Sequence, residues 1–74
     1  MDIRDLLYYH RQYRNYARAG MVPKMTCDVC DVHYFPRTFD YDTVELWCMN
    51  CDYRMSPGET INNYVVKRVK EIEE

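Results

Sequence analysis

Four cysteines, arranged as two C-x2-C pairs, are the residues whose type and spacing most directly indicate chemistry in this chain. The first pair is Cys27 and Cys30, the second is Cys48 and Cys51, and seventeen residues separate the pairs. Each pair can fold into a tight knuckle that directs two thiolates at one tetrahedral ion. The chain has 4 cysteines, so none is left over. The spacing therefore predicts one structural Zn²⁺ bound by all four.

Other uses of these cysteines are less well supported by the sequence. Two disulfides would require an oxidising compartment, and the first residues, Met1 to Asp5, lack the basic and apolar segments of a secretory signal. A thioredoxin-like redox pair needs a βαβ unit, for which the chain has no room. His33 could replace one cysteine, but four sulfurs already close the site. We therefore expect an intracellular protein, in the cytoplasm or in a particle assembled there, and not a secreted one.

The length of the chain makes such a metal site energetically important. With 74 residues we expect a single domain over 1–74, and one apolar core of this size supplies only about 3–5 kcal/mol of stability. A structural Zn²⁺ in a small finger contributes about 10–16 kcal/mol of apparent binding energy, which becomes folding energy. The sequence has no apolar run near the ~18 residues of a membrane span, so no membrane partner is expected.

Residues 2–19 have the pattern of an amphipathic helix. Asp2 is a good N-cap, Gly20 suits the C′ position, and Pro23 prevents continuation. Apolar and aromatic residues recur at helical spacing on one arc, which we expect to face either the core or a partner. The residues of this arc are Ile3, Leu6, Tyr9, His10, Tyr13, Tyr16 and Ala17.

A neighbouring arc of the same helix carries four arginines, which we call the arginine ridge: Arg4, Arg11, Arg14 and Arg18. It is either a solvated face or a docking surface, with Tyr9, Tyr13 and Tyr16 adding rigid contact area. Arginine and tyrosine also suit unpaired RNA bases. Residues 1–26 have five basic against two acidic side chains, whereas residues 27–53 have one against six. The helix is thus the predicted basic contact.

Residues 32–39 and 43–47 are rich in β-branched and aromatic residues and predict a hairpin, with a turn over 40–42. Pro36 must lie on an edge strand or at a bulge. In the second strand Val44 and Leu46 share one face, and Trp47 lies on the other. Because Trp47 precedes Cys48, its ring is expected to cover the metal site or to pack on the first helix.

At this point residues 25–55 resemble the zinc-ribbon family: a knuckle, a hairpin and a second knuckle that ends Cys51-Asp52-Tyr53-Arg54, similar to the C-G-Y-R of such ribbons. Ribbon knuckles usually have glycine after the second cysteine, where this chain has Asp31 and Asp52, so the left-handed backbone must be adopted by aspartate. Rubredoxin-like iron sites also rely on those glycines, which favours zinc here. The resemblance implies macromolecular binding in transcription, translation or assembly machinery.

Residues 57–72 are expected to form a second helix. Ser56-Pro57-Gly58-Glu59 has the form of a capping box with proline at the first helical position. The acidic end, Glu71 to Glu74, opposes the helix dipole and is expected to fray. The predicted buried stripe consists of Ile61, Tyr64, Val65, Val69 and Ile72. The pattern leaves open whether the two helices pack on each other or on opposite sides of the ribbon.

Together these patterns predict a small α+β metal-stabilised domain, in which a zinc-ribbon hairpin is flanked by an N-terminal and a C-terminal helix. No catalytic constellation or phosphate-binding glycine loop is present, so neither an enzyme nor a small-molecule substrate is expected. The expected function is that of a small accessory or adaptor protein docked on a larger protein or nucleoprotein assembly, and the composition would suit a viral protein. Alternatives are direct binding of RNA or single-stranded DNA, and self-association.

Overall fold

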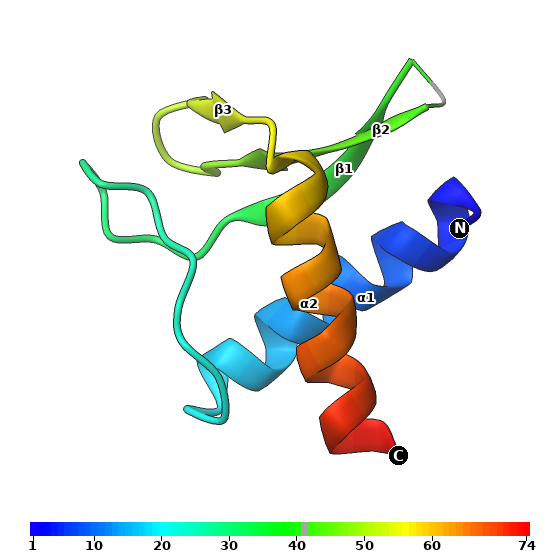
Figure 1. Cartoon of the computed structure of the whole chain (residues 1–74). Helices are drawn as coiled ribbons and strands as arrows, with labels where there is room; N and C mark the ends of the chain where they lie inside the picture. Colours follow the sequence, from blue (N-terminus) through cyan, green and yellow to red (C-terminus); the bar gives the residue numbers. More distant parts are fainter. Residues whose placement is uncertain (41) are drawn as a thin grey trace.

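The computed structural model describes residues 1–40 and 42–74, which form two helices and three short strands (Figure 1). Along the chain these are α1 (Ile3–Arg18), β1 (Phe35–Phe39), β2 (Thr43–Trp47), β3 (Arg54–Met55) and α2 (Gly58–Glu73). The strands form an antiparallel sheet in the order β1-β2-β3. The helices cross each other, and α1 contacts both α2 and the first two strands. The predicted small α+β class is confirmed.

Both ends of α1 are closed by the predicted residues. The Asp2 side chain accepts a hydrogen bond from the Arg4 amide at 2.8 Å. At the other end Gly20 has a φ of 79°, and the Met21 amide donates to the Tyr16 carbonyl at 2.9 Å. This is the Schellman arrangement, in which the glycine reverses the chain and the last helical carbonyls are satisfied.

The first strand is shorter than predicted because the residues before it close a knuckle. Residues 32–34 pair back towards residues 25 and 26: His33 forms an isolated bridge with Thr26, and the Tyr34 amide donates to the Met25 carbonyl at 3.1 Å. Only Phe35–Phe39 pair with β2. Pro36 lies on β1, an edge strand, as predicted. The sequence did not predict β3, which at two residues is too short to show an alternating pattern. Of the predicted turn, Tyr41 lies outside the described residues.

The predicted capping box of α2 is wrong. The helix begins at Gly58, its N-cap is Pro57, and no side chain caps it by a hydrogen bond among the described residues. Gly58 has a φ of 74°, a left-handed conformation that redirects the chain at the point where the box requires continuous helical backbone. The Ser56 hydroxyl is therefore not placed as a cap for this helix.

The sequence predicted a frayed acidic end of α2, but the helix continues to Glu73. Side chains of α1 hold this end by hydrogen bonds. Glu73 accepts hydrogen bonds from the Tyr8 hydroxyl at 2.9 Å, the Gln12 amide at 2.9 Å and the Tyr16 hydroxyl at 2.7 Å. The Tyr16 and Gln12 bonds are the main causes that lower the pKa of the Glu73 carboxyl. A tertiary contact thus outweighs the unfavourable helix dipole at this end.

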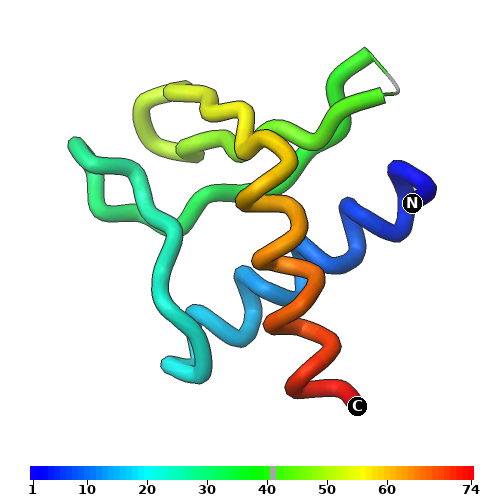
Figure 2. The backbone as a smooth tube through the Cα atoms, viewed as in Figure 1, coloured from blue at the N-terminus to red at the C-terminus, as the bar shows by residue number. Residues whose placement is uncertain are grey.

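Two hydrophobic clusters form the core, and Met25 packs against both. The helix cluster lies between α1 and α2, and the ribbon cluster lies under the knuckles and β2. Figure 2 shows that the segment after α1 rises beside the sheet and brings the first knuckle next to the loop between β2 and β3. The helix cluster consists of Tyr13, Ala17, Val22, Val65 and Val69, and the ribbon cluster of Cys27, Tyr34, Leu46 and Cys48.

Candidate metal centre

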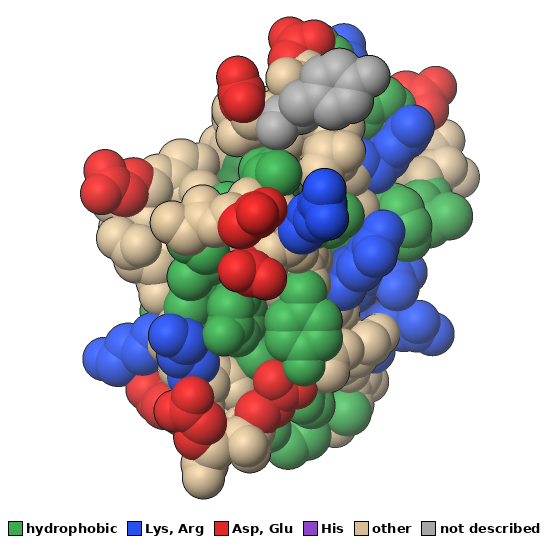
Figure 3. Space-filling model, turned by 90° about the vertical axis from the view of Figure 1, so that its right-hand side faces the viewer, with side chains coloured by type: hydrophobic (Ala, Val, Ile, Leu, Met, Phe, Trp, Pro, Cys, Tyr) green, Lys and Arg blue, Asp and Glu red, His purple; other side chains and the backbone are tan. Residues whose placement is uncertain are grey.

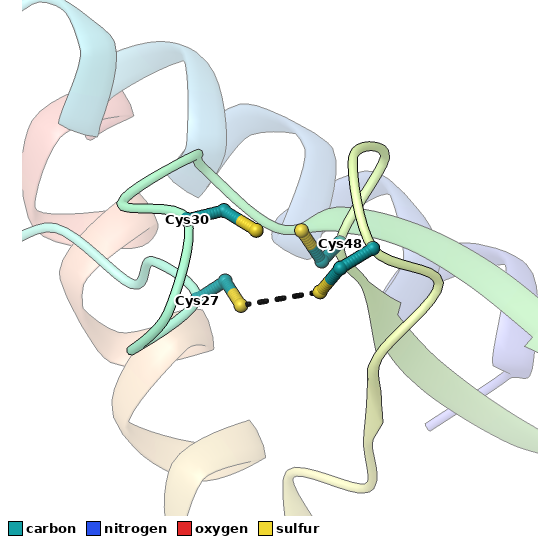
Figure 4. Close-up of side chains that lie close together, drawn as sticks. Cys27, Cys30 and Cys48 are labelled. Atoms are coloured by element: carbon teal, nitrogen blue, oxygen red, sulfur yellow. Dashed lines mark hydrogen bonds between the residues drawn. The ribbon is translucent and has the colours of Figure 1, made fainter.

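The fold brings the four cysteines together. Their Sγ atoms all lie within 4.8 Å of one another, and the Cys27 and Cys51 sulfurs are 3.7 Å apart. Figure 4 shows Cys27, Cys30 and Cys48 pointing towards one common region between the two knuckles. Cys27 and Cys48 are buried, Cys30 is half-buried and Cys51 is exposed. One side of the cluster is therefore closed by the core, while the other faces solvent.

The two knuckles have the same backbone hydrogen bonds. In the first, the Asp31 amide donates to the Cys27 carbonyl at 2.8 Å, and the Cys27 amide donates to the Val32 carbonyl at 3.0 Å. The second repeats both bonds, from Asp52 to Cys48 at 3.2 Å and from Cys48 to Tyr53 at 2.8 Å. Each pair of sulfurs is thus fixed by the same short loop.

The residue that follows each pair adopts the backbone that glycine usually provides. Asp31 has a φ of 54° and Asp52 a φ of 60°. Aspartate tolerates this left-handed region better than most side chains. The expectation that aspartate adopts the left-handed backbone at both positions is confirmed, and each aspartate adds a carboxylate next to a pair of cysteines.

Hydrogen bonds to backbone amides and among the thiols, together with burial, spread the pKa values of Cys48 and Cys51. The backbone amides of Cys51 and Asn50 help to lower the pKa of the Cys48 thiol to about 7. The Tyr53 amide acts in the same direction on Cys51, but the other three thiols outweigh it and raise that pKa to about 12. Such a cluster does not lose all its protons unless a cation compensates the charge.

The dimensions of the cluster fit a tetrahedral metal ion. With metal–sulfur bonds of about 2.3 Å, the sulfurs of a tetrahedral site lie about 3.8 Å apart, close to the 3.7 Å between Cys27 and Cys51. The widest pair, at no more than 4.8 Å, would need to close by at most about 1 Å. All four cysteines are free, so the alternative of two disulfides is not what this structure contains.

Several contacts outside the ligand set position the knuckles. The Tyr13 hydroxyl donates to the Pro23 carbonyl at 2.6 Å and so ties α1 to the segment that leads into the first knuckle. The Asn50 side-chain amide donates to the Cys30 sulfur at 3.3 Å and links the two knuckles. The sequence analysis did not identify Asn50. Its position between Cys48 and Cys51, where a side-chain amide can reach a sulfur, could have indicated this role from the sequence.

The arginine ridge and the tyrosines of α1 differ in exposure. Arg4, Arg11 and Arg18 are exposed, whereas Arg14 is half-buried with its guanidinium 5.6 Å from the centre of the Phe35 ring. The tyrosines face α2: Tyr13 is 3% exposed, and Tyr9 and Tyr16 pack against the helix cluster. The sequence left open whether the apolar and aromatic arc of this helix faces the core or a partner. In the structure it faces the core, and Tyr13 has almost no exposed surface for a partner.

Trp47 lies on the face of the sheet opposite to Val44 and Leu46, which are buried. Its ring is contacted by two arginines, with the Arg37 guanidinium 4.2 Å and the Arg54 guanidinium 5.0 Å from the ring centre. That both arginines lie over this ring was not predicted from the sequence. Cross-strand neighbours were not predictable at Arg54, because β3 itself was not predicted.

No family model, curated protein or solved structure matches this chain in the three comparisons. Among the described residues, neither helix has the length and apolar character needed to cross a bilayer. The observation that bears on function is therefore the four-cysteine cluster, which is built to hold a metal ion.

Proposed function

We propose that the four cysteines bind one structural Zn²⁺ in a ribbon-like module, and that the protein acts by binding a macromolecule and not by catalysis. The convergence of four sulfurs from two equivalent knuckles carries this proposal. Zinc is the preferred metal for a tetrahedral all-sulfur site, and four protein ligands leave no position for a reacting water. Bound zinc would hold the thiolates and stabilise the fold, with the ribbon cluster packed beneath it.

The proposed contact surface is the arginine ridge of α1. Arg4, Arg11 and Arg18 are exposed on a helix whose opposite side is fixed by α2 and the sheet, so they are presented by a rigid support. Arginine gives bidentate, directional hydrogen bonds to carboxylates and phosphates. The protein would then be a small accessory subunit docked on a larger protein or nucleoprotein assembly. Reduced thiols in the site are consistent with an intracellular location.

Metal content tests the first part of the proposal. The purified protein should carry one zinc per chain in native mass spectrometry and elemental analysis, and Cys48→Ser should lose it. Cys48 is the ligand of choice because its side chain is buried in the ribbon cluster. Metal in substoichiometric amounts, or a site that strongly prefers iron, would contradict the assignment.

Affinity capture from the native source tests the second part. Arg11→Glu combined with Arg18→Glu should abolish recovery of the partner, because it reverses charge at two exposed positions of the ridge. Lys67→Glu combined with Lys70→Glu, at two exposed positions of α2, is the charge-matched control and should retain it. Equal recovery with all three proteins would show that the ridge is only solvated.

A further inference from the structure

The outer face of the sheet carries an arginine cluster around one tryptophan. Trp47 on β2 lies opposite Phe35 on β1 and opposite Arg54 on β3. Arg37 reaches the same ring from β1, so arginines from both neighbouring strands contact the single tryptophan of the chain. A guanidinium stacked on a ring keeps its N–H edge for hydrogen bonding and is held in one orientation.

This cluster is continuous with the arginine ridge of α1. Arg14 lies over Phe35, and Phe35 forms a wall of two shallow hollows on either side of it. One, of about 200 Å³, is lined by Arg11, Arg14 and residues of β1. The other, of about 290 Å³, is lined by Phe35, Arg37, Trp47 and part of the second knuckle. We call the combined surface the arginine–aromatic face: Arg11, Arg14, Phe35, Arg37, Trp47 and Arg54.

The charge of this face differs from that of the chain as a whole. The chain has a formal net charge of −2, yet the face combines four arginines, and the carboxylates that the register and the second hollow place beside them are Glu45 opposite Arg37 and Asp52 beside Trp47. Figure 3, which faces the side of the hairpin tip and of the start of α1, shows several Lys and Arg side chains gathered along one edge of the view. The net negative charge is therefore carried elsewhere.

Guanidinium planes next to aromatic rings match a partner that has both phosphates and unpaired bases. Trp47 is half-buried under Arg37 and Arg54, so the exposed rings are those of β1. Phe35 is 36% exposed, and Phe39 on the same strand is 43% exposed. Bases stack on aromatic rings and on arginine planes, while the arginine edges bind phosphate. A duplex hides its bases from such a surface. An acidic peptide would satisfy the arginines but would leave the rings without a partner.

We propose that the arginine–aromatic face binds single-stranded nucleic acid, with phosphates at the arginine edges and bases stacked on the exposed ring of Phe35 and on the guanidinium planes that cover Trp47. This inference rests on the proposed binding role and specifies the class of partner, in a place that includes the sheet and not only α1. The structure brings Arg37 and Arg54 to one ring, although the segment in which Arg37 lies is acidic as a whole.

Binding of defined oligonucleotides to the zinc-loaded full chain tests the inference. Labelled single-stranded RNA and DNA of about 12 nucleotides, a matched duplex and a polyglutamate peptide are titrated while fluorescence anisotropy is followed. We expect binding of single strands, with a log–log salt slope of about −2.8 if all four arginines contact phosphate. The RNA and DNA arms show which strand is preferred. Trp47 emission should change as bases stack on the guanidiniums that cover its ring, a readout that requires no mutation.

Two charge-matched double variants locate the site. Arg37→Ser with Arg54→Ser should weaken binding about tenfold or more and reduce the slope to about −1.4. Lys67→Ser with Lys70→Ser should leave both unchanged. The inference is overturned if single strands do not bind, if the duplex or polyglutamate binds better, or if Trp47 emission is constant. It is also overturned if both double variants lose the same amount of affinity for single strands. Zinc content and circular dichroism of the same samples report separately on the metal module, and partner capture through the ridge can succeed when nucleic acid does not bind.

Discussion

The two hydrophobic clusters differ in what fills them. In the helix cluster every buried member is an ordinary packing residue, including Val65 and Val69, which are fully buried. In the ribbon cluster two of the four buried members, Cys27 and Cys48, are also the candidate metal ligands. The ribbon therefore has little core apart from its site. Binding of a metal ion would therefore complete the core of the ribbon half, whereas the helix half packs without a ligand.

The two halves are nevertheless connected at a few points. Met25 packs against both clusters, and the Tyr13 hydroxyl holds the Pro23 carbonyl two residues earlier. Through these contacts we expect loss of order in the knuckles to reach the helix pair.

Removal of the metal should have the largest effect. A chelator should unfold the ribbon and, through loss of the Met25 and Tyr13 contacts, the helix pair as well, because the apparent contribution of a structural zinc is about 10–16 kcal/mol. Circular dichroism and amide NMR of the chelated sample should show a disordered chain, and added Zn²⁺ should restore the native spectra. A chelated protein that still melts sharply would separate the halves and end this account of stability.

A cavity in the helix cluster should cost less. Val65→Ala removes two methyl groups from a fully buried position and should lower the free energy of unfolding by about 2 kcal/mol in urea. Val66→Ala, at the adjacent half-buried position, is the control and should cost clearly less. Zinc affinity of the folded Val65→Ala protein should be unchanged. A large loss of affinity would mean that the halves are coupled more tightly than Met25 and Tyr13 indicate.

Acid should weaken the helix pair through His10. Its ring is 3% exposed, and its Nε2 lies 2.8 Å from the Asn62 Oδ1. Burial, opposed in part by the Asn62 hydrogen bond, lowers the pKa of His10 below the ordinary 6.5. The unfolded chain then takes up a proton first, so stability should fall as the pH drops below about 6.5, by at most about 1.4 kcal/mol per pH unit.

Urea unfolding across this pH range, with wild type compared with His10→Gln, isolates the effect. The glutamine variant keeps a hydrogen-bonding group near Asn62 but does not titrate, so its stability should depend less on pH. The loss of stability in acid that comes from protonation of the thiols and of His33 is the same in both proteins. Identical pH profiles would show that His10 does not contribute.

The smallest effect is expected at the knuckle. Asp31→Gly removes a carboxylate beside the sulfurs and suits a φ of 54°, so zinc affinity in a chelator competition should rise severalfold. Asp40→Gly is a matched control, because Asp40 has a φ of 53° but lies on the hairpin. Both variants relieve backbone strain, and only the first should bind zinc more tightly. Equal or weaker affinity for Asp31→Gly would show that charge at this position is unimportant.

The spacing of cysteines, glycine and apolar residues determined the local features of this protein. The two C-x2-C pairs, the caps of α1 at Asp2 and Gly20, and the left-handed aspartates after each pair all depend on residues within a few positions of one another. Interactions of that range are set by covalent geometry and backbone preference, which a single sequence displays directly.

Only the tertiary structure decided which surfaces meet. It places the tyrosine arc against α2, holds Glu73 with three side chains of α1, and brings Arg37 and Arg54 to one tryptophan ring. Glu73 is more than fifty residues from its partners, and the partners of Trp47 lie on two different strands. Such contacts depend on how the helices and strands pack, and the periodicity of one segment contains no information about its distant neighbour.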